Sequence, residues 1–141
     1  MKIYHTSPTE IKEINSYGIA GSCLFFSANI YTMTTSEKYF VYSLEIDENK
    51  IVKVSDLYDE EIVVEIADEF GTLTDVAENL LDGSENEWDY DCDAEKSWWL
   101  QGKQGECAQV MGFEACIAKD EQGTVYIVPM IGREKDLVLE K

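Results

Sequence analysis

The chain contains a single histidine, His5, which follows a short strand-like segment at residues 2–4. Two small hydroxyl residues, Thr6 and Ser7, come directly after it. An imidazole at a strand end, beside backbone amides at a sheet edge, is suited to holding a polar ligand. A lone histidine at a strand end is also a common structural residue, so the prediction of a site here depends on partners elsewhere in the chain.

Two further segments carry residue types that fit such a site. Phe25 and Tyr31 belong to an aromatic segment, and Asp120 and Glu121 belong to a turn near the other end of the chain. Aromatic faces carry negative quadrupole density, which attracts a flat cationic ring such as nicotinamide. A carboxylate stabilises the oxocarbenium-like centre that forms when a glycosidic bond breaks. Together with the histidine, these residue types predict cleavage of NAD.

In that hypothesis, His5 hydrogen-bonds a ribose hydroxyl and the backbone of Thr6 pairs with the carboxamide of nicotinamide. Consecutive strand residues face opposite sides, so only one of Phe25 and Phe26 can face the ligand. The aromatic residues can equally fill a core, and turn chemistry alone explains the composition of the acidic turn that contains Asp120 and Glu121. The sequence leaves these alternatives open.

Length and composition set limits on the class of protein. The chain has 141 residues, 45% of them apolar, which fits one domain over residues 1–141 with one core. It has no apolar run of about 18 residues and no basic start followed by an apolar segment, so we expect a cytoplasmic protein. The four cysteines form no C-x-x-C pair, so we expect reduced thiols and no metal site.

The net charge of −18 is concentrated in the middle of the chain. Residues 45–95 hold 19 acidic residues and two lysines, a net charge of −17, which leaves −1 for the rest. Such a field repels nucleic acid and anionic membranes and attracts basic protein surfaces, although an acidic face also serves solubility alone. The cations Lys2, Lys119, Arg133 and Lys135 lie in the two end segments. We therefore predict a near-neutral NAD site and a separate acidic face that contacts a basic protein surface.

Hydrophobic patterning predicts an α+β domain with strands at both ends and helices between them. Short strands are expected at residues 2–4, 22–27 and 137–139. Two hairpins are expected, one from 39–46 and 51–54 and the other from 115–119 and 124–130. Helices are expected after a capping box at 7–10, from Ser55 to Phe70, from Thr74 to about Gly83, and through residues 98–111. Residues 82–95 are expected to form an exposed acidic loop, within an acidic helical insertion at about 55–111.

Several short motifs resemble a known superfamily. They are His5-Thr6-Ser7, the glycines Gly18 and Gly21, the segment Phe25-Phe26-Ser27 with Tyr31, and the strand Tyr126-Ile127-Val128. They look like the His-Tyr-Glu branch of the ADP-ribosyltransferases, which implies a split β core of two small sheets with peripheral helices. More narrowly, residues 5–11 and 120–126 resemble a phage anti-CRISPR family of that fold. The resemblance covers about residues 1–46 and 112–141.

This resemblance implies a mono-ADP-ribosyltransferase that uses NAD as co-substrate in the cytoplasm of a bacterial host. The implied target is the subunit of a type I-F CRISPR surveillance complex that reads the protospacer-adjacent motif. The implied NAD-binding residues are His5, Thr6, Ser7, Phe25, Ser27 and Tyr31, and the implied catalytic residues are His5, Tyr31, Asp120 and Glu121. The branch places its glutamate where this chain has Val125, so the acid would come from Asp120 or Glu121.

Two other functions are compatible with the same sequence. The acidic middle suits a non-enzymatic inhibitor that mimics nucleic acid by its charge. An NAD glycohydrolase toxin would consume NAD without a protein acceptor. Neither the acceptor residue nor the oligomeric state follows from the sequence.

Overall fold

The computed structural model describes residues 1–7, 23–27, 40–90, 92–120, 123–130 and 133–140, and the capping box at 7–10 lies mostly outside them. The strands are β1 (Lys2–Ser7), β2 (Cys23–Phe26), β3 (Phe40–Glu45), β4 (Ile51–Lys53), β5 (Ala115–Asp120), β6 (Gly123–Pro129) and β7 (Val138–Leu139). The α-helices are α1 (Glu60–Phe70), α2 (Thr74–Leu81) and α3 (Ala94–Val110). This α+β composition confirms the predicted fold class.

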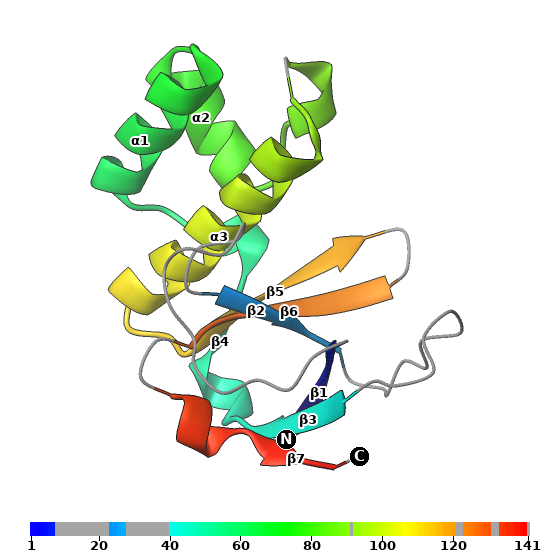
Figure 1. Cartoon of the computed structure of the whole chain (residues 1–141). Coiled ribbons are helices and arrows are strands. Elements are labelled where there is room, and N and C mark those ends of the chain that lie inside the picture. The colour runs from blue at the N-terminus through cyan, green and yellow to red at the C-terminus, as the bar shows by residue number, and fades with distance from the viewer. Residues whose placement is uncertain (8–22, 28–39, 91, 121–122, 131–132, 141) are drawn as a thin grey trace.

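The strands form two small sheets, one above the other in Figure 1. The first has the order β1-β3-β7 and the second has the order β2-β6-β5-β4. A single antiparallel bridge between Tyr4 and Ser27 joins the first sheet to the chain just beyond β2. The sheets therefore meet at one corner and diverge from it, which is the split β core that the family resemblance implied.

The helices form a third layer over the second sheet (Figure 1), and α3 packs on β2, β5 and β6. The acidic middle of the chain is the connection from β4 to β5, which pair in parallel. Parallel neighbours need a long crossover, and residues 54–114 supply it. The predicted hairpin of residues 39–46 with 51–54 is therefore wrong, because β3 pairs with β1 and β7 while β4 joins the other sheet. The second predicted hairpin, β5 with β6, is confirmed.

Two helix ends show how local sequence sets the boundaries. Helix α1 begins after Asp59, whose carboxylate accepts a hydrogen bond from the Ile62 N–H, so the predicted start at Ser55 is wrong. Ser55 lies in a short 3-10 helix instead. The helix ends at Gly71, which adopts a left-handed conformation with φ of 63°, as the sequence predicted.

The layers enclose two apolar cores. One lies between the helices and the second sheet and includes Ile66, Leu100 and Ile127. The other lies between the two sheets and includes Ile3 and Phe26. Because side chains alternate along a strand, β2 contributes to both cores.

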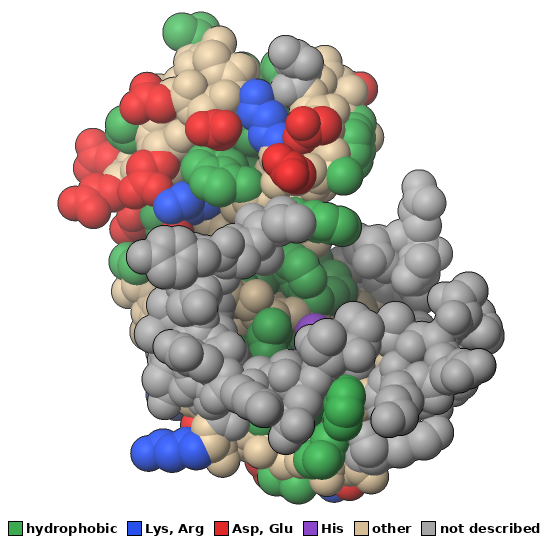
Figure 2. All heavy atoms as spheres, in the orientation of Figure 1, with side chains coloured by type: hydrophobic (Ala, Val, Ile, Leu, Met, Phe, Trp, Pro, Cys, Tyr) green, Lys and Arg blue, Asp and Glu red, His purple; other side chains and the backbone are tan. Residues whose placement is uncertain are grey.

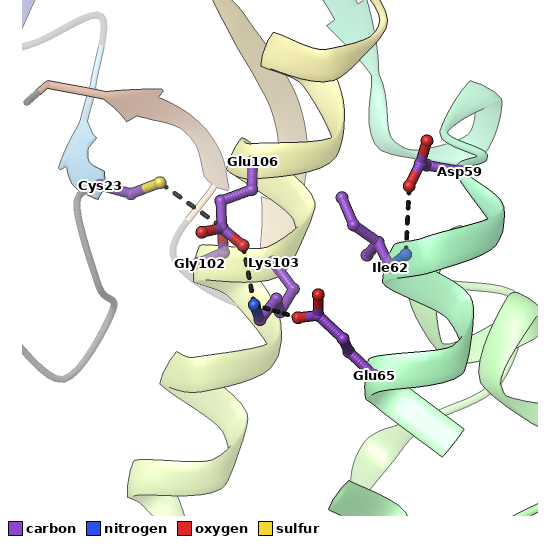
Figure 3. Close-up of polar contacts among 7 residues, drawn as sticks. All are labelled: Cys23, Asp59, Ile62, Glu65, Gly102, Lys103 and Glu106. Carbon is purple, nitrogen blue, oxygen red and sulfur yellow. Dashed lines mark hydrogen bonds and ion pairs between the residues drawn. The ribbon is translucent and has the colours of Figure 1, made fainter. Parts of the chain in front are cut away.

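Contacts between α1 and α3 fix the helical layer (Figure 3). The Lys103 ammonium on α3 lies between the carboxylates of Glu65 on α1 and Glu106 on α3. On the opposite side of α3, the thiol of Cys23 donates to the Gly102 carbonyl at 3.5 Å. Helix α3 is thus bound to the neighbouring helix and to β2. No helix in the described part of the chain combines the length and apolar character needed to cross a membrane.

Candidate functional site

The corner where the two sheets meet carries the histidine. Beyond the bridge, in which the Tyr4 and Ser27 backbones exchange two hydrogen bonds of 2.8 Å, the strands separate. At this point Nδ1 of His5 lies 2.7 Å from the carbonyl oxygen of Phe25. A side-chain hydrogen bond thus continues the connection between the sheets where the backbones diverge.

Strand alternation places the backbone of Thr6 at the same corner. The N–H and C=O of Tyr4 point toward Ser27, so those of Thr6, two residues along β1, point to the same side. This is the side away from β3, where the split between the sheets opens. The structure therefore brings together His5, the Thr6 backbone and Ser27, which is buried at 6% exposure.

The surroundings of His5 determine its protonation state. Burial lowers the pKa of the imidazole below its ordinary value of 6.5, and the hydrogen bond with the Phe25 carbonyl opposes part of that shift. The ring is therefore neutral at pH 7. A carbonyl oxygen only accepts, so Nδ1 carries the proton and donates, which leaves Nε2 with a lone pair. Among the described residues no hydrogen bond to Nε2 is formed, and its lone pair can accept one.

The aromatic pair of β2 divides between the two cores. Phe26 is buried between the sheets, and its ring centroid lies 5.6 Å from that of His5 at an interplanar angle of 53°. Phe25 is half-buried and packs against the core under the helices. The ring that touches His5 is therefore that of Phe26, and Phe25 contributes its carbonyl. The sequence predicted opposite faces but did not identify which ring meets the histidine.

The proposed acids lie at the end of the β5–β6 hairpin. Asp120 is the last residue of β5 and pairs with Gly123. Gly123 lies three residues before Tyr126 on β6, a distance of about 10 Å along the strand. Tyr126 is the strand partner of Phe26. The side chains of Asp120 and Ser7, and the whole of Glu121 and Tyr31, lie outside the described residues. Their predicted roles therefore stay predictions.

Two of the cations expected near the site are engaged in ion pairs. Lys2 binds Glu140 at 2.9 Å, and Glu140 also accepts a hydrogen bond from Ser43. Arg133 pairs with Glu114 and Asp136. Both groups tie the carboxyl-terminal segment to the sheets. Most carboxylates visible in Figure 2 lie over the helical layer. In the described residues, no group of three or more His, Cys, Asp or Glu side chains is placed to hold a metal ion.

Sequence reasoning missed Phe26 as the ring that contacts His5. It also missed the Phe25 carbonyl as the group that fixes the imidazole. No sequence signal identified the carbonyl, because the bridge between Tyr4 and Ser27 joins segments from different sheets and is set by tertiary packing.

Comparisons with known proteins bear on the family and the fold. Residues 1–133 match a family model described as "Anti-CRISPR Type I-F ADP-ribosyltransferase AcrIF11". A solved structure described as "Crystal structure of an anti-CRISPR protein" superposes with a TM-score of 0.56 at 22% sequence identity. The superposition covers 91% of this chain and 88% of the chain in that structure, and this similarity establishes the fold. No curated protein matches the sequence.

Proposed function

Because the chain belongs to the anti-CRISPR type I-F ADP-ribosyltransferase family, which covers residues 1–133, we propose that it transfers ADP-ribose from NAD to a protein of the host CRISPR machinery. The observation that carries this proposal is the fixed, neutral His5 at the corner of the split β core. Its Nε2 can accept a hydrogen bond, and strand alternation turns the Thr6 backbone away from β3. The single domain 1–141 acts in the cytoplasm of the bacterial host.

The chemistry of these groups suits a dinucleotide. Nε2 of His5 accepts a hydrogen bond from a ribose hydroxyl, which needs no charge on the ring. The N–H and C=O of Thr6 match the carboxamide of nicotinamide, which has one acceptor and two donors. Ser7, Ser27 and Tyr31 complete the proposed NAD site, with Tyr31 stacking on the nicotinamide. Phe25 supports the site through its carbonyl, which fixes His5, because its ring packs under the helices.

The transfer step breaks the bond between the ribose and the nicotinamide nitrogen, and the bonding electron pair leaves with nicotinamide. The anomeric carbon then accepts the lone pair of a side chain on the target protein, which loses its proton to solvent. Asp120 or Glu121 stabilises the positive charge on the ribose, because a carboxylate near an oxocarbenium-like centre lowers the energy of the transition state. Asp120 is our first choice, since β5 holds its backbone in a regular strand.

We propose that the target is the subunit of the type I-F surveillance complex that recognises the protospacer-adjacent motif. The acidic crossover, residues 54–114, would meet the basic surface with which such a subunit contacts nucleic acid. The family supports an anti-CRISPR role, and the charge partition supports a basic partner.

The test is mass spectrometry of a purified type I-F surveillance complex after incubation with a substoichiometric amount of this protein, with and without NAD. We expect one subunit to gain the mass of ADP-ribose only with NAD. Asp120→Ala should abolish the gain while the far-ultraviolet circular dichroism stays that of wild type, with Glu121→Ala as the matched comparison. Full activity in both variants would remove the turn from the mechanism.

The same assay separates the alternatives. An acidic mimic would inhibit only at stoichiometric amounts and leave no mass increment. A glycohydrolase would consume NAD equally with and without the complex. Either result would refute the proposed transfer.

A further inference from the structure

A groove of about 1440 Å³ lies between the helical layer and the β5–β6 hairpin. Its walls are the segment 82–88, which joins α2 to α3, and the amino-terminal half of α3. Its floor includes Ala118 and Val125, which are paired across β5 and β6. In Figure 1 these elements lie at the right, where the light green segment stands over the orange hairpin.

The groove presents exposed aromatic surface. Trp88 is 55% exposed and Trp98 is 44% exposed, and both line the groove. Tryptophan is costly to leave in water and is enriched among the residues that dominate the energy of protein interfaces. Two exposed tryptophans in one groove therefore indicate a surface that is covered in a complex.

The groove is also acidic, and its carboxylates are held in place. The Glu85 carboxylate accepts a hydrogen bond from the Tyr90 hydroxyl at 2.6 Å, and that of Glu87 accepts one from Ser97 at 3.2 Å. The Asp82 carboxylate accepts one from the Ser84 N–H. No lysine or arginine of the described residues forms a salt bridge with these three carboxylates. Lys53 also lines the groove, so three fixed carboxylates face one ammonium, and the remaining negative charge favours a cationic ligand.

We propose that this groove binds a basic segment of the acceptor protein, with an arginine or lysine side chain between the tryptophans and the carboxylates. A guanidinium stacks on an indole face and donates to a carboxylate at the same time, so one arginine satisfies both features of the groove. The negative charge disfavours NAD and nucleic acid as occupants, because both carry phosphates.

The floor of the groove connects this surface to the proposed reaction centre. Ala118 and Val125 lie two residues from Asp120 and Gly123, at the end of the same hairpin. A segment seated in the groove therefore runs alongside the strands that lead to the proposed catalytic acid. The groove thus orients the acceptor, and this inference rests on the proposed function of the protein.

The experiment compares the affinity of variants for a purified type I-F surveillance complex by biolayer interferometry. The double variant Glu85→Gln/Glu87→Gln removes two charges, and its amide oxygens still accept the hydrogen bonds from Tyr90 and Ser97. The matched control is Glu69→Gln/Glu78→Gln, which neutralises two exposed acids outside the groove. Trp88→Ala and Trp98→Ala test the aromatic walls, with Tyr58→Ala, 52% exposed, as their control.

We expect each groove variant to weaken binding of the complex about tenfold or more, in line with an interface hot spot. The controls should stay within about twofold of wild type, and all variants should keep the affinity for NAD. Raising the salt concentration should weaken wild-type binding more than binding of the Glu85→Gln/Glu87→Gln variant.

Three outcomes decide between the two proposals. Wild-type affinity in all groove variants would overturn the groove assignment alone. Binding that depends on the groove, without any transfer of ADP-ribose, would overturn the proposed function and leave the groove as a docking site. Failure of the wild-type chain to bind the complex would overturn both.

Discussion

The imidazole of His5 has two functions in our account, and two substitutions separate them. In asparagine the side-chain amide nitrogen occupies the position of Nδ1, so His5→Asn keeps a donor for the Phe25 carbonyl but loses Nε2. In glutamine the amide occupies the position of Nε2, so His5→Gln keeps a group for the ligand but leaves the carbonyl without its donor. The contact is 2.7 Å long, which marks it as a well-formed hydrogen bond.

The two variants should therefore show opposite effects on stability and binding. Loss of a neutral hydrogen bond to NAD costs about 0.5–1.5 kcal/mol, so His5→Asn should weaken NAD binding roughly 2- to 12-fold. Its free energy of unfolding should fall by only about 1 kcal/mol, from the lost packing of the ring on Phe26. His5→Gln leaves a half-buried carbonyl unsatisfied and loses the same packing, so we expect a fall of about 2–3 kcal/mol with NAD affinity within about twofold of wild type.

Isothermal titration calorimetry with NAD and unfolding in urea measure the two quantities on the same samples. If His5→Asn binds NAD like wild type, Nε2 does not contact the ligand and the site assignment is wrong. If the two variants unfold at the same urea concentration, the bond between Nδ1 and the Phe25 carbonyl does not support the fold.

Two further predictions concern stability. Well above pH 6.5 the ring of His5 is neutral in both the folded and the unfolded state. Because burial lowers the pKa of the folded-state ring, the unfolded chain takes up the proton first as the pH falls toward and below 6.5. The free energy of unfolding of wild type should therefore fall between pH 7 and about 5.5 more steeply than that of His5→Asn, and equal slopes in urea titrations would contradict this account. The second prediction concerns Gly105→Ala, which would place a Cβ 2.5 Å from the Cys23 thiol and 2.9 Å from a methyl carbon of Ile127. Overpacking should lower the free energy of unfolding by about 1–3 kcal/mol, which outweighs the gain of about 1 kcal/mol from the higher helix propensity of alanine. We therefore expect Gly105→Ala to unfold at a lower urea concentration than wild type. The control Gln109→Ala, at an exposed position of the same helix, should change the free energy of unfolding by less than about 0.5 kcal/mol. A Gly105→Ala variant more stable than wild type would show that α3 and the sheet are less closely packed than the structure indicates.

Local sequence patterns correctly predicted most of the elements. The four-residue spacing of Tyr58, Ile62, Ile66 and Phe70 predicted one apolar helix face. Ile62, Ile66 and Phe70 are buried on α1, whereas Tyr58 precedes the helix and is 52% exposed. The prediction that Gly71 ends the helix is confirmed. The turn at Gly123 identified the β5–β6 hairpin. These features depend on neighbours within a few residues, so the sequence contains the information directly. The start of α1 was misjudged because Ser55 and Asp59 are both good N-caps, and the choice between them depends on the preceding strand.

The sequence by itself determined the types of most elements, the concentration of acids in the middle of the chain, and the choice of His5 as a candidate site residue. Only the tertiary structure decided that β4 pairs in parallel with β5 and that His5 donates to the Phe25 carbonyl. The physical reason is that a strand's pattern encodes which face is buried, whereas every strand edge offers the same N–H and C=O groups. The choice of partner, and with it the tautomer and pKa of the imidazole, follows from how all the layers pack together.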